Sequence, residues 1–356
     1  MPATGTDRSQ PAVSVIRVSV IIPARNEEVS LSACLQSLVT QNGVPFEIIV
    51  VNDHSIDRTR EIATSFSSNG VRVIEASPLP PGWTGKNNAV SAGSRIARGE
   101  WLLFTDADTI HLPGSVARSL GEAIRNGAAL LSYSPEQLVK SFWEKAIMPV
   151  IFAELAASFR PSQVSDPNSS AAAANGQYIL ITREAYDAVG GHAAIAGNLL
   201  EDVALAGAVK RSGRKIFFRY GGDALRTRMY RSFAQLREGW TKNLALLFPS
   251  PSRLATLRAL EFVLIVASLA ISVVSALREH KQPAVVAGVL CVILYAFFLA
   301  RIRRAHFSRE ANVLALFGLP LFSYLLLRSK KVHAKGNVHW KGRTYSDEKS
   351  LLATGH

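Results

Sequence analysis

The amino-acid sequence predicts an α/β fold, in which a Rossmann-like domain with a mostly parallel sheet is followed by C-terminal membrane helices. Three observations lead to this prediction. Short β-branched runs alternate with helical segments between residues 16 and 250, acidic residues directly follow several of these runs, and three uncharged apolar runs occur after residue 258. The mean hydropathy of +0.15 over 356 residues is high for a soluble domain, which supports a membrane part.

The order of the elements gives the sheet its direction. Helical crossovers with short connections place successive strands parallel, so that their carboxyl ends lie at one edge. We expect strands at residues 17–23, 46–51, 71–75, 101–104, 128–133, 175–181, 215–220 and 223–230. We expect helices at residues 29–41, 56–66, 86–97, 113–126, 142–159, 183–189, 201–210 and 231–247. The domain then spans residues 16–250 and follows a disordered tail at residues 1–15.

The strand at residues 101–104 ends in two carboxylates, Asp106 and Asp108, spaced two positions apart. In extended or turning backbone, such a pair can project the same way and offer hard oxygen ligands to a divalent cation on a diphosphate. The alternative is a solvated strand end with a helix N-cap, since residues 109–113 lead into the next helix. The pair alone does not decide between these interpretations.

Two other strand ends also carry acids. Glu27 follows the first strand and Asp53 follows the second, so one crevice at the carboxyl edge collects both of them with Asp106 and Asp108. Asp53 alone could be an N-cap for the next helix. Four converging carboxylates cannot all ionise without a cation or several N–H donors, and a bound metal would supply the positive charge.

These motifs resemble family 2 glycosyltransferases of the GT-A fold, and in particular membrane-bound members that act on hopanoid or carotenoid lipids. The matching segments are Val20-Ile21-Ile22-Pro23-Ala24-Arg25-Asn26-Glu27-Glu28, Val51-Asn52-Asp53-His54-Ser55-Ile56-Asp57-Arg58-Thr59, Thr105-Asp106-Ala107-Asp108 and Pro81-Gly82-Trp83-Thr84-Gly85-Lys86. The resemblance implies inverting transfer of a sugar from a nucleotide diphosphate donor. It covers residues 16–250 closely and the remainder loosely.

The resemblance also implies roles for single residues. Pro23, Glu27 and Asp53 would hold the uridine half of a UDP-sugar. Asp106 would contact the ribose or the sugar, and Asp108 would hold Mg2+ or Mn2+ on the diphosphate.

Lys86 would lie near the donor phosphates, although it could also be a solvated residue at a helix start, where a cation opposes the helix dipole. Glu201 and Asp202 open another predicted helix, and acids in a first turn often only complement the dipole. Displacement at an anomeric carbon nevertheless needs a base opposite the leaving group. The resemblance assigns that role to Asp202, with Glu201 in support. His192 could touch acceptor or phosphate, or be a surface imidazole.

The predicted helix at residues 231–247 carries Arg237 and Trp240 as candidate substrate-binding residues. Processive members of the family have Gln-x-x-Arg-Trp at this place, whereas this chain has Gln235-Leu236-Arg237-Glu238-Gly239-Trp240. The departure favours transfer of a single sugar. The cations that could pair with a diphosphate or a lipid phosphate, or belong to a solvated basic face, are Arg226, Arg228, Arg237 and Lys242.

Membrane association is predicted from residues 258–328. The apolar runs at residues 262–277, 284–300 and 311–327 are short for spanning helices but carry no charge. The basic clusters at residues 301–304 and 328–331 should stay cytoplasmic, so two spans fit and a third would export the tail. Gly318-Leu319-Pro320 should bend the third run into a re-entrant or interfacial segment. The apolar helix at residues 142–159 is either a core or dimer helix or an interfacial helix.

The charge of the chain points to the same partner. The net charge is +13, and ten basic residues against one acid, Glu310, lie between residues 301 and 345, beside apolar segments. This placement favours a membrane surface over nucleic acid. The two cysteines, Cys34 and Cys291, make a disulfide framework improbable, and the polar start of the chain shows no signal peptide. Residues 329–356 are expected to be a basic cytoplasmic tail, and disorder is one interpretation of its segment at residues 336–345.

The sequence and the resemblance together thus predict a membrane-anchored, cytoplasm-facing, metal-dependent glycosyltransferase. It would move one sugar from a UDP-sugar to a lipid, which the resemblance implies to be of isoprenoid type. Two alternatives stay open. The acceptor could be a polyprenyl phosphate, whose anionic oxygen needs no base. The chain could also be a nucleotide-sugar-binding scaffold for another membrane enzyme.

Overall fold

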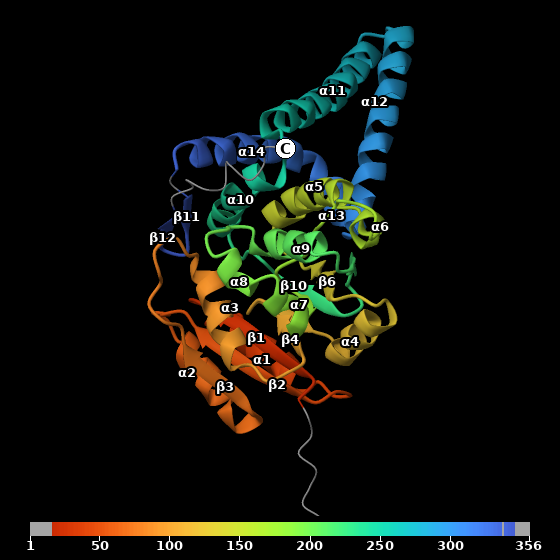
Figure 1. The fold of residues 1–356 in the computed structure, drawn as a ribbon. Coiled ribbons are helices and arrows are strands. Elements are labelled where there is room, and N and C mark those ends of the chain that lie inside the picture. The colour runs from red at the N-terminus through yellow and green to blue at the C-terminus, as the bar shows by residue number, and fades with distance from the viewer. Residues whose placement is uncertain (1–15, 337, 346–356) are drawn as a thin grey trace, which may run out of the picture.

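The computed structural model describes residues 16–336 and 338–345, in which a central sheet lies below a layer of long helices (Figure 1). The sheet has the strand order β3-β2-β1-β4-β8-β6-β9. Its strands are β1 (Val18–Ala24), β2 (Phe46–Asn52), β3 (Val71–Glu75), β4 (Trp101–Phe104), β6 (Leu130–Ser134), β8 (Ile179–Thr182) and β9 (Ile216–Tyr220). Neighbouring strands are parallel except where β8 pairs with β4 and β6. The predicted α/β class with a mostly parallel sheet is confirmed.

Alternate residues of each central strand serve two different cores. In β1, Val20 and Ile22 face one core and Ile21 faces the other, and all three side chains are fully buried. Each such burial stabilises the fold by about 1.5–3 kcal/mol. The first core is closed by α1 (Leu31–Val39), α2 (Thr59–Ser65) and α4 (Ser115–Arg125). The second core is closed by α3 (Gly85–Ile96), α6 (Pro161–Ser165), α7 (Arg183–Ala188) and α9 (Glu201–Arg211).

A second, small sheet was not predicted. It consists of β5 (Thr109–His111), β10 (Leu225–Thr227) and β7 (Glu136–Gln137), in the order β5-β10-β7. The sequence instead led residues 109–113 directly into the next helix. β5 pairs with a strand more than one hundred residues later in the chain, so no local pattern could indicate it.

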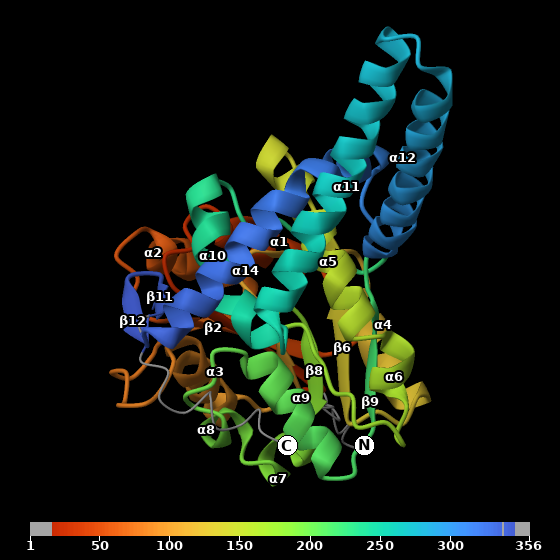
Figure 2. The same ribbon diagram turned by 90° about the horizontal axis from the view of Figure 1, so that it is seen from above.

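The helical layer forms a third core. It is built from α5 (Phe142–Ser158), α10 (Phe233–Leu247), α11 (Pro251–Leu277), α12 (Lys281–Ile302), α13 (Arg309–Leu314) and α14 (Gly318–Ala334). α11 and α12 pair as a hairpin that projects away from the sheet domain (Figure 2). Its surface exposes large apolar side chains, such as Leu277 and Phe297. Both helices are long and apolar enough to cross a membrane.

The third apolar run differs from this hairpin. The segment Arg309–Ala334 also has the length and composition of a span, but half of its apolar window is buried inside the protein. A 3-10 turn at Ala315–Phe317 interrupts the helix. Pro320 lacks the N–H that would bond to the carbonyl of Leu316, which explains the break just before Gly318. α14 then packs along α10, α11 and α5.

The predicted basic tail contains regular structure. Residues 329–334 continue α14, and the hairpin β11 (Val338–Trp340) and β12 (Arg343–Tyr345) follows. The interpretation of residues 336–345 as disordered is therefore wrong for the described residues of that stretch, 336 and 338–345. The predicted disordered tail at residues 1–15 and the end of the basic tail at residues 346–356 lie outside the described residues.

An ion-pair cluster ties the projecting hairpin to the rest of the molecule. Glu154 of α5 pairs with Arg258 of α11, Nε to Oε1 2.9 Å, and with Arg301 of α12. Glu261 completes the cluster, with Arg258 Nη1 at 2.9 Å and Arg301 Nη2 at 2.5 Å from its Oε2. These four side chains are mostly shielded from solvent, so removing one charge leaves its partners uncompensated.

We expect Glu154→Gln to lower the free energy of unfolding by about 3 kcal/mol, the lower end of the range for a broken buried pair. The matched control is Glu310→Gln, which removes the exposed pair between Glu310 and Lys145 and should cost less than about 1 kcal/mol. Thermal unfolding of both variants in the same detergent measures the difference. Equal melting temperatures would show that the cluster does not hold the hairpin.

Candidate functional site

The carboxyl ends of β1, β2 and β4 meet at one edge of the sheet, as predicted. The Asp53 N–H, just after β2, donates to Ala24 O of β1 at 2.8 Å, and the Thr105 N–H, just after β4, donates to Ile21 O at 3.2 Å. These bonds continue the sheet into the loops and fix the positions of the acids that follow. Asp53 is almost fully buried, with 3% of its surface exposed.

A cavity of about 820 Å³ opens at this edge. It is large enough for a nucleotide-sized ligand together with part of a second one. Of the candidate site residues, it is lined by Pro23, Glu27, Asp53, Lys86, Asp106, Asp108, Glu201, Asp202 and Trp240. The structure therefore brings together residues from six separate segments of the chain.

Lys86 lies at the centre of this acid cluster. Its Nζ is 2.7 Å from Asp106 Oδ1 and 2.7 Å from Glu201 Oε1, so it joins the strand-end motif to the start of α9. Burial alone would lower the pKa of Lys86, but the two carboxylates outweigh burial and raise it well above its ordinary value. The ammonium group is thus held charged, and Lys86 is not the solvated helix-start residue of the alternative interpretation.

Asp108 has the properties expected of a cation ligand. Its Oδ1 is buried and has no hydrogen-bond partner among the described residues. Burial, and then the charges of Asp106 and Glu27, raise the pKa of Asp108 to about 7. A carboxylate oxygen left without a donor, close to two other acids, fits a site that gains a cation with its ligand.

No group of three or more His, Cys, Asp or Glu side chains that could hold a metal ion by themselves occurs among residues 16–336 and 338–345. A divalent cation at Asp108 would therefore need oxygen ligands from a bound diphosphate. Mg2+ is commonly bound in this way, through one or two carboxylates and substrate phosphates.

Glu201 and Asp202 lie on the opposite side of Lys86 from the strand-end motif. Burial would raise the pKa of Glu201, but Lys86 and Lys242 outweigh it and hold that pKa below its ordinary value. For Asp202, burial and the neighbouring Glu201 charge raise the pKa to about 6. The two carboxylates thus differ, and the one with the higher pKa is the better proton acceptor near neutral pH.

Asp202 is also oriented by hydrogen bonds. Its Oδ2 accepts from the Gly176 N–H at 2.9 Å and its Oδ1 accepts from the Val203 N–H at 2.8 Å. A Cβ atom at Gly176 would lie 3.0 Å from Lys86 Nζ and 3.1 Å from Glu201 Oε1. A side chain at this position would therefore push the charged ends of Lys86 and Glu201 aside by a few tenths of an ångström, whereas glycine lets the loop approach the cluster without displacing them.

The basic candidates separate into different roles. Arg226 pairs with Glu136 at 2.8 Å, and Arg228 holds the buried Glu144 through two nitrogen atoms, at 3.0 and 3.2 Å. Both are structural ion pairs. Arg237 is exposed and does not line the cavity. Lys242 does line it, and its ammonium lies 5.0 Å from the centroid of the Trp340 ring.

Trp240 and His192 are both buried, with different consequences. Trp240 lines the cavity, and its Nε1 has no hydrogen-bond partner in the described part of the chain. His192 is a core residue: its Nδ1 lies 3.1 Å from the Tyr186 hydroxyl, and its ring packs edge-on against Phe104. Burial lowers the pKa of His192 to about 4, so it is neutral. Both sequence interpretations of His192, ligand contact and surface residue, are wrong.

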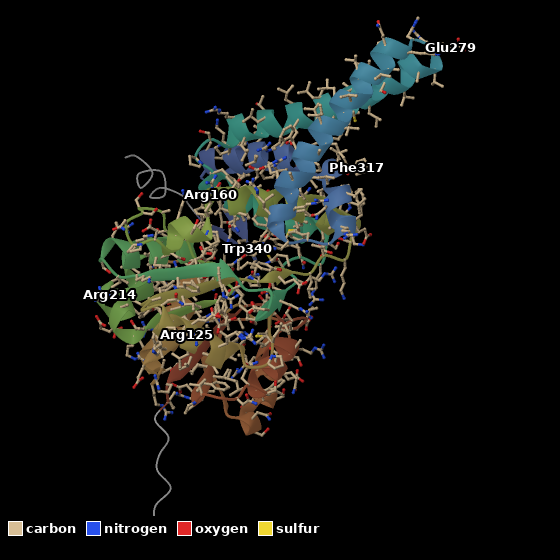
Figure 3. The ribbon with its side chains drawn as sticks, turned by 90° about the vertical axis from the view of Figure 1, so that its right-hand side faces the viewer. Arg125, Arg160, Arg214, Glu279, Phe317 and Trp340 are labelled. Carbon is tan, nitrogen blue, oxygen red and sulfur yellow. The ribbon has the colours of Figure 1, made fainter. Side chains whose placement is uncertain are left out.

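Four residues of the C-terminal hairpin contribute to the site and were not predicted. They are Trp340, Lys341, Arg343 and Tyr345, which line the cavity from a part of the chain far from the strand-end motifs. Figure 3 shows Trp340 within the body of the molecule, far from Glu279 at the tip of the helical hairpin. The sequence signal was a mixture of aromatic and basic residues, which is also typical of an unstructured membrane-binding tail.

One part of the cavity wall is apolar. Its apolar residues come from α5 and the position after it, from β9, from the segment between β10 and α10, and from the end of α10: Phe152, Leu155, Phe159, Phe218, Met229 and Leu247. The lining also includes residues 304–306, which directly follow α12. The cavity thus extends from the acid cluster to the place where the projecting helices leave the domain.

Comparisons with known proteins identify relatives of this chain. Residues 19–190 match the family model described as Glycosyl transferase family 2. The 4,4'-diaponeurosporenoate glycosyltransferase of Staphylococcus aureus (strain USA300) is 28% identical over 338 residues, which cover 93% of this chain and 89% of that protein.

Solved structures that match this chain in a structural comparison include mannosyltransferase PcManGT from Pyrobaculum calidifontis, in complex with GDP-Man and Mn2+. It has a TM-score of 0.49 and 16% identity, over 91% of this chain and 90% of that one. The structure of S. aureus TarS 1-349 in complex with UDP-GlcNAc has a TM-score of 0.43 and 13% identity, over 93% of this chain and 99% of that one.

We expect Lys86→Met to destabilise the protein by about 2 kcal/mol at pH 7.5, because Asp106 and Glu201 would face each other without their shared cation. Without Lys86, burial is opposed less, so the pKa of Glu201 should rise. An acid with a raised pKa in the folded state destabilises the fold above that pKa, so the difference from wild type should shrink as the pH falls to 5.

Thermal unfolding at both pH values measures this effect. Arg17→Gln, which removes the exposed pair of Arg17 with Glu100, is the control and should change stability little at either pH. If the loss of stability in Lys86→Met is the same at both pH values, the electrostatic explanation is contradicted.

Proposed function

We propose that this chain, which carries a family 2 glycosyltransferase domain with a GT-A-like α/β fold, transfers one sugar from a UDP-sugar to an isoprenoid-type lipid with inversion. The observation that carries the proposal is the single cavity that joins the acid cluster to an apolar wall beside the projecting helices. Such a cavity suits two ligands, a charged one at the acid cluster and an apolar one at the apolar wall.

The donor would bind at the carboxyl edge of the sheet. Pro23, Glu27 and Asp53 would contact the nucleoside, and Asp106 the ribose or sugar. Asp108 would hold Mg2+ or Mn2+, consistent with its unpaired Oδ1. When bound, this cation would neutralise the charge of the leaving diphosphate. Lys86 is held charged beside Asp106, where it would attract the donor phosphates.

The acceptor would lie against the apolar wall, with its hydroxyl toward Asp202. In the transfer, the acceptor oxygen forms a bond to the anomeric carbon while the bond from that carbon to the diphosphate breaks. Asp202 takes the proton of the hydroxyl. Glu201, which Lys86 holds ionised, keeps a negative charge beside Asp202 and so raises the proton affinity of this base. The unpaired indole N–H of Trp240 is a candidate donor to a substrate oxygen.

Membrane attachment would deliver such an acceptor. α11 and α12 are the candidate spans, and the basic residues 301–304 would keep the catalytic domain on the cytoplasmic side. α14, half buried against the domain, would lie at the membrane surface. In this arrangement residues 16–250 are the transferase domain, residues 258–328 contain the membrane segments, and the residues after 328 return to the cytoplasm.

A second acceptor class is favoured by Lys242. This half-buried cation lines the cavity and forms no ion pair with the described residues. Burial lowers the pKa of Lys242, although the nearby Glu201 and Asp202 carboxylates oppose that effect. The S. aureus relative is named for diaponeurosporenoate, a carboxylate. A carboxylate or polyprenyl-phosphate acceptor is already anionic, so it would need a cation such as Lys242 rather than a base.

Sugar transfer by the purified full chain in nanodiscs tests the proposal. UDP release should require a divalent metal and lipid from the source cells, and mass spectrometry of lipids from cells with and without the gene identifies the product. We expect Asp108→Ala and Asp202→Asn each to lower turnover at least about 100-fold without unfolding the protein. The exposed surface variant Glu184→Gln should keep full turnover.

The outcomes separate the alternatives. If Asp202→Asn keeps its turnover and Lys242→Gln loses it, the acceptor is anionic. If wild type binds the UDP-sugar but transfers no sugar, so that no UDP is produced under any condition, the chain is a nucleotide-sugar-binding scaffold.

The pH dependence follows from the raised pKa of Asp202. With a hydroxyl acceptor and saturating Mn2+, which keeps Asp108 ionised, kcat/KM should be constant above pH 7. It should fall about tenfold per pH unit below pH 6, because the base is then protonated. The same profile in Asp202→Asn, measured on its residual activity, should lack this acidic limb. A limb that persists in the variant would assign the base to another residue.

A further inference from the structure

The C-terminal hairpin turns back to the first two strands of the chain. β11 and β12 are joined by Lys341 and Gly342, which both have positive φ, at 45° and 75°. A two-residue turn of this kind is a type I′ turn, whose twist matches that of an antiparallel hairpin. The turn places Lys341 and Arg343 close together, beside the loops that follow β1 and β2.

Each of these cations pairs with one of the carboxylates assigned to the nucleoside. Arg343 contacts Asp53 through both terminal nitrogens, with Nη2 2.9 Å from Oδ1. Lys341 pairs with Glu27, and its Nζ also donates to Arg25 O at 3.2 Å. In return, Arg25 Nε donates to Lys341 O at 3.2 Å. The hairpin is therefore fixed to both strand-end loops by charged and backbone contacts.

The burial of these pairs shows that the hairpin is part of the site. The side chain of Asp53 is 5% exposed and that of Arg343 is 17% exposed. A bidentate arginine pair at this depth orients its carboxylate strongly, and losing one partner leaves a buried charge without compensation. Gly85, at the start of α3, leaves the space in which the Arg343 guanidinium reaches Asp53.

The hairpin lines the cavity without filling it. Trp340, Lys341, Arg343 and Tyr345 are among the lining residues, and the volume of about 820 Å³ remains with the hairpin in place. A carboxylate can accept about four hydrogen bonds. At Asp53, Arg343 uses two of them and the His54 Nδ1 lies 3.4 Å from Oδ1, so about one acceptor site stays free. This site suits the N–H of a nucleobase or a ribose hydroxyl.

The charges favour the same role. The donor half of the site presents Glu27, Asp53, Asp106 and Asp108, and a nucleoside diphosphate adds further negative charge. Without the hairpin, Lys86 would be the one cation that pairs with these acids among the described residues. Lys341 and Arg343 compensate the two acids nearest the nucleoside and so reduce the repulsion that a nucleotide would meet.

We propose that the hairpin at residues 338–345 is the closing wall of the nucleotide site, with Arg343 and Lys341 as positioning residues that hold Asp53 and Glu27 for the nucleoside. The proposal rests on the proposed donor class. It assigns to the chain end that follows α14 a role in donor binding, not in membrane attachment alone.

Titration of the full chain in nanodiscs with UDP, and separately with GDP, in the presence of MnCl2 tests this proposal. We expect Arg343→Gln to weaken UDP binding about 10- to 100-fold, and Lys341→Gln to weaken it less, because Lys341 is more exposed. Arg343→Lys should recover part of the loss, since it restores the charge without the bidentate geometry. Lys335→Gln removes one exposed positive charge just before the hairpin and should bind UDP as wild type does.

A double-mutant cycle shows whether Arg343 acts through Asp53. The double variant Asp53→Asn, Arg343→Gln should bind UDP no more weakly than Asp53→Asn alone. If Arg343→Gln fails to fold, as judged by thermal unfolding, Arg343→Lys and Lys341→Gln carry the test.

The results distinguish this inference from the proposed function. If Arg343→Gln and Lys341→Gln bind UDP as tightly as wild type, or more tightly, the hairpin is a bystander or an inhibitor and the inference falls while the proposed function stands. If wild type binds neither UDP nor GDP, both fall.

Discussion

Repulsion between carboxylates is the constraint on which the rest of this structure depends. Parallel strands deliver Glu27, Asp53 and Asp106 to one edge of the sheet, and α9 adds Glu201 close by. In a partly buried cleft such charges are tolerated only when cations lie among them. Lys86 comes from the start of α3, and two more cations come from the last hairpin of the chain. The site therefore requires parts of the chain that are far apart in sequence.

The helical layer connects this charged edge of the sheet to α11 and α12, the candidate membrane spans. α14 is held on α10 by Ser329, whose Oγ donates to Thr241 O at 2.6 Å and accepts from the Ala245 N–H at 2.8 Å. The cluster around Glu154 holds α11 and α12 against α5. Part of the apolar wall of the cavity, Phe152 and Leu155 of α5 and Leu247 of α10, lies on these same helices, so the contacts of the helical layer also place that part of the site.

Much of the fold could be predicted from the sequence because its signals are local. β3 and β4 lie at the predicted residues, since β-branched or apolar runs bounded by turns are readable without tertiary information. The same logic placed the acids at adjacent strand ends. β5 escaped prediction because it is three residues long and its partner lies far away in the chain.

Parts of the site depend on contacts that sequence patterns do not contain. The hairpin residues were missed because a stretch of aromatic and basic residues reads equally as an unstructured tail. Arg237 matched a motif by type, but the helix presents it to solvent, while Trp240 three residues later is buried at the cavity. His192 illustrates the opposite case, since a buried imidazole in the core leaves no distinct sequence signal.

The pairing of Arg343 with Asp53 spans 290 residues and has a consequence for biosynthesis. A ribosome completes β1 and β2 long before it reaches the hairpin, and the two longest apolar helices are made in between. The carboxylates of the early strands therefore meet these partner cations only after the hairpin has been synthesised. If the hairpin closes the nucleotide pocket, that pocket is complete only once α11 and α12 have also been made.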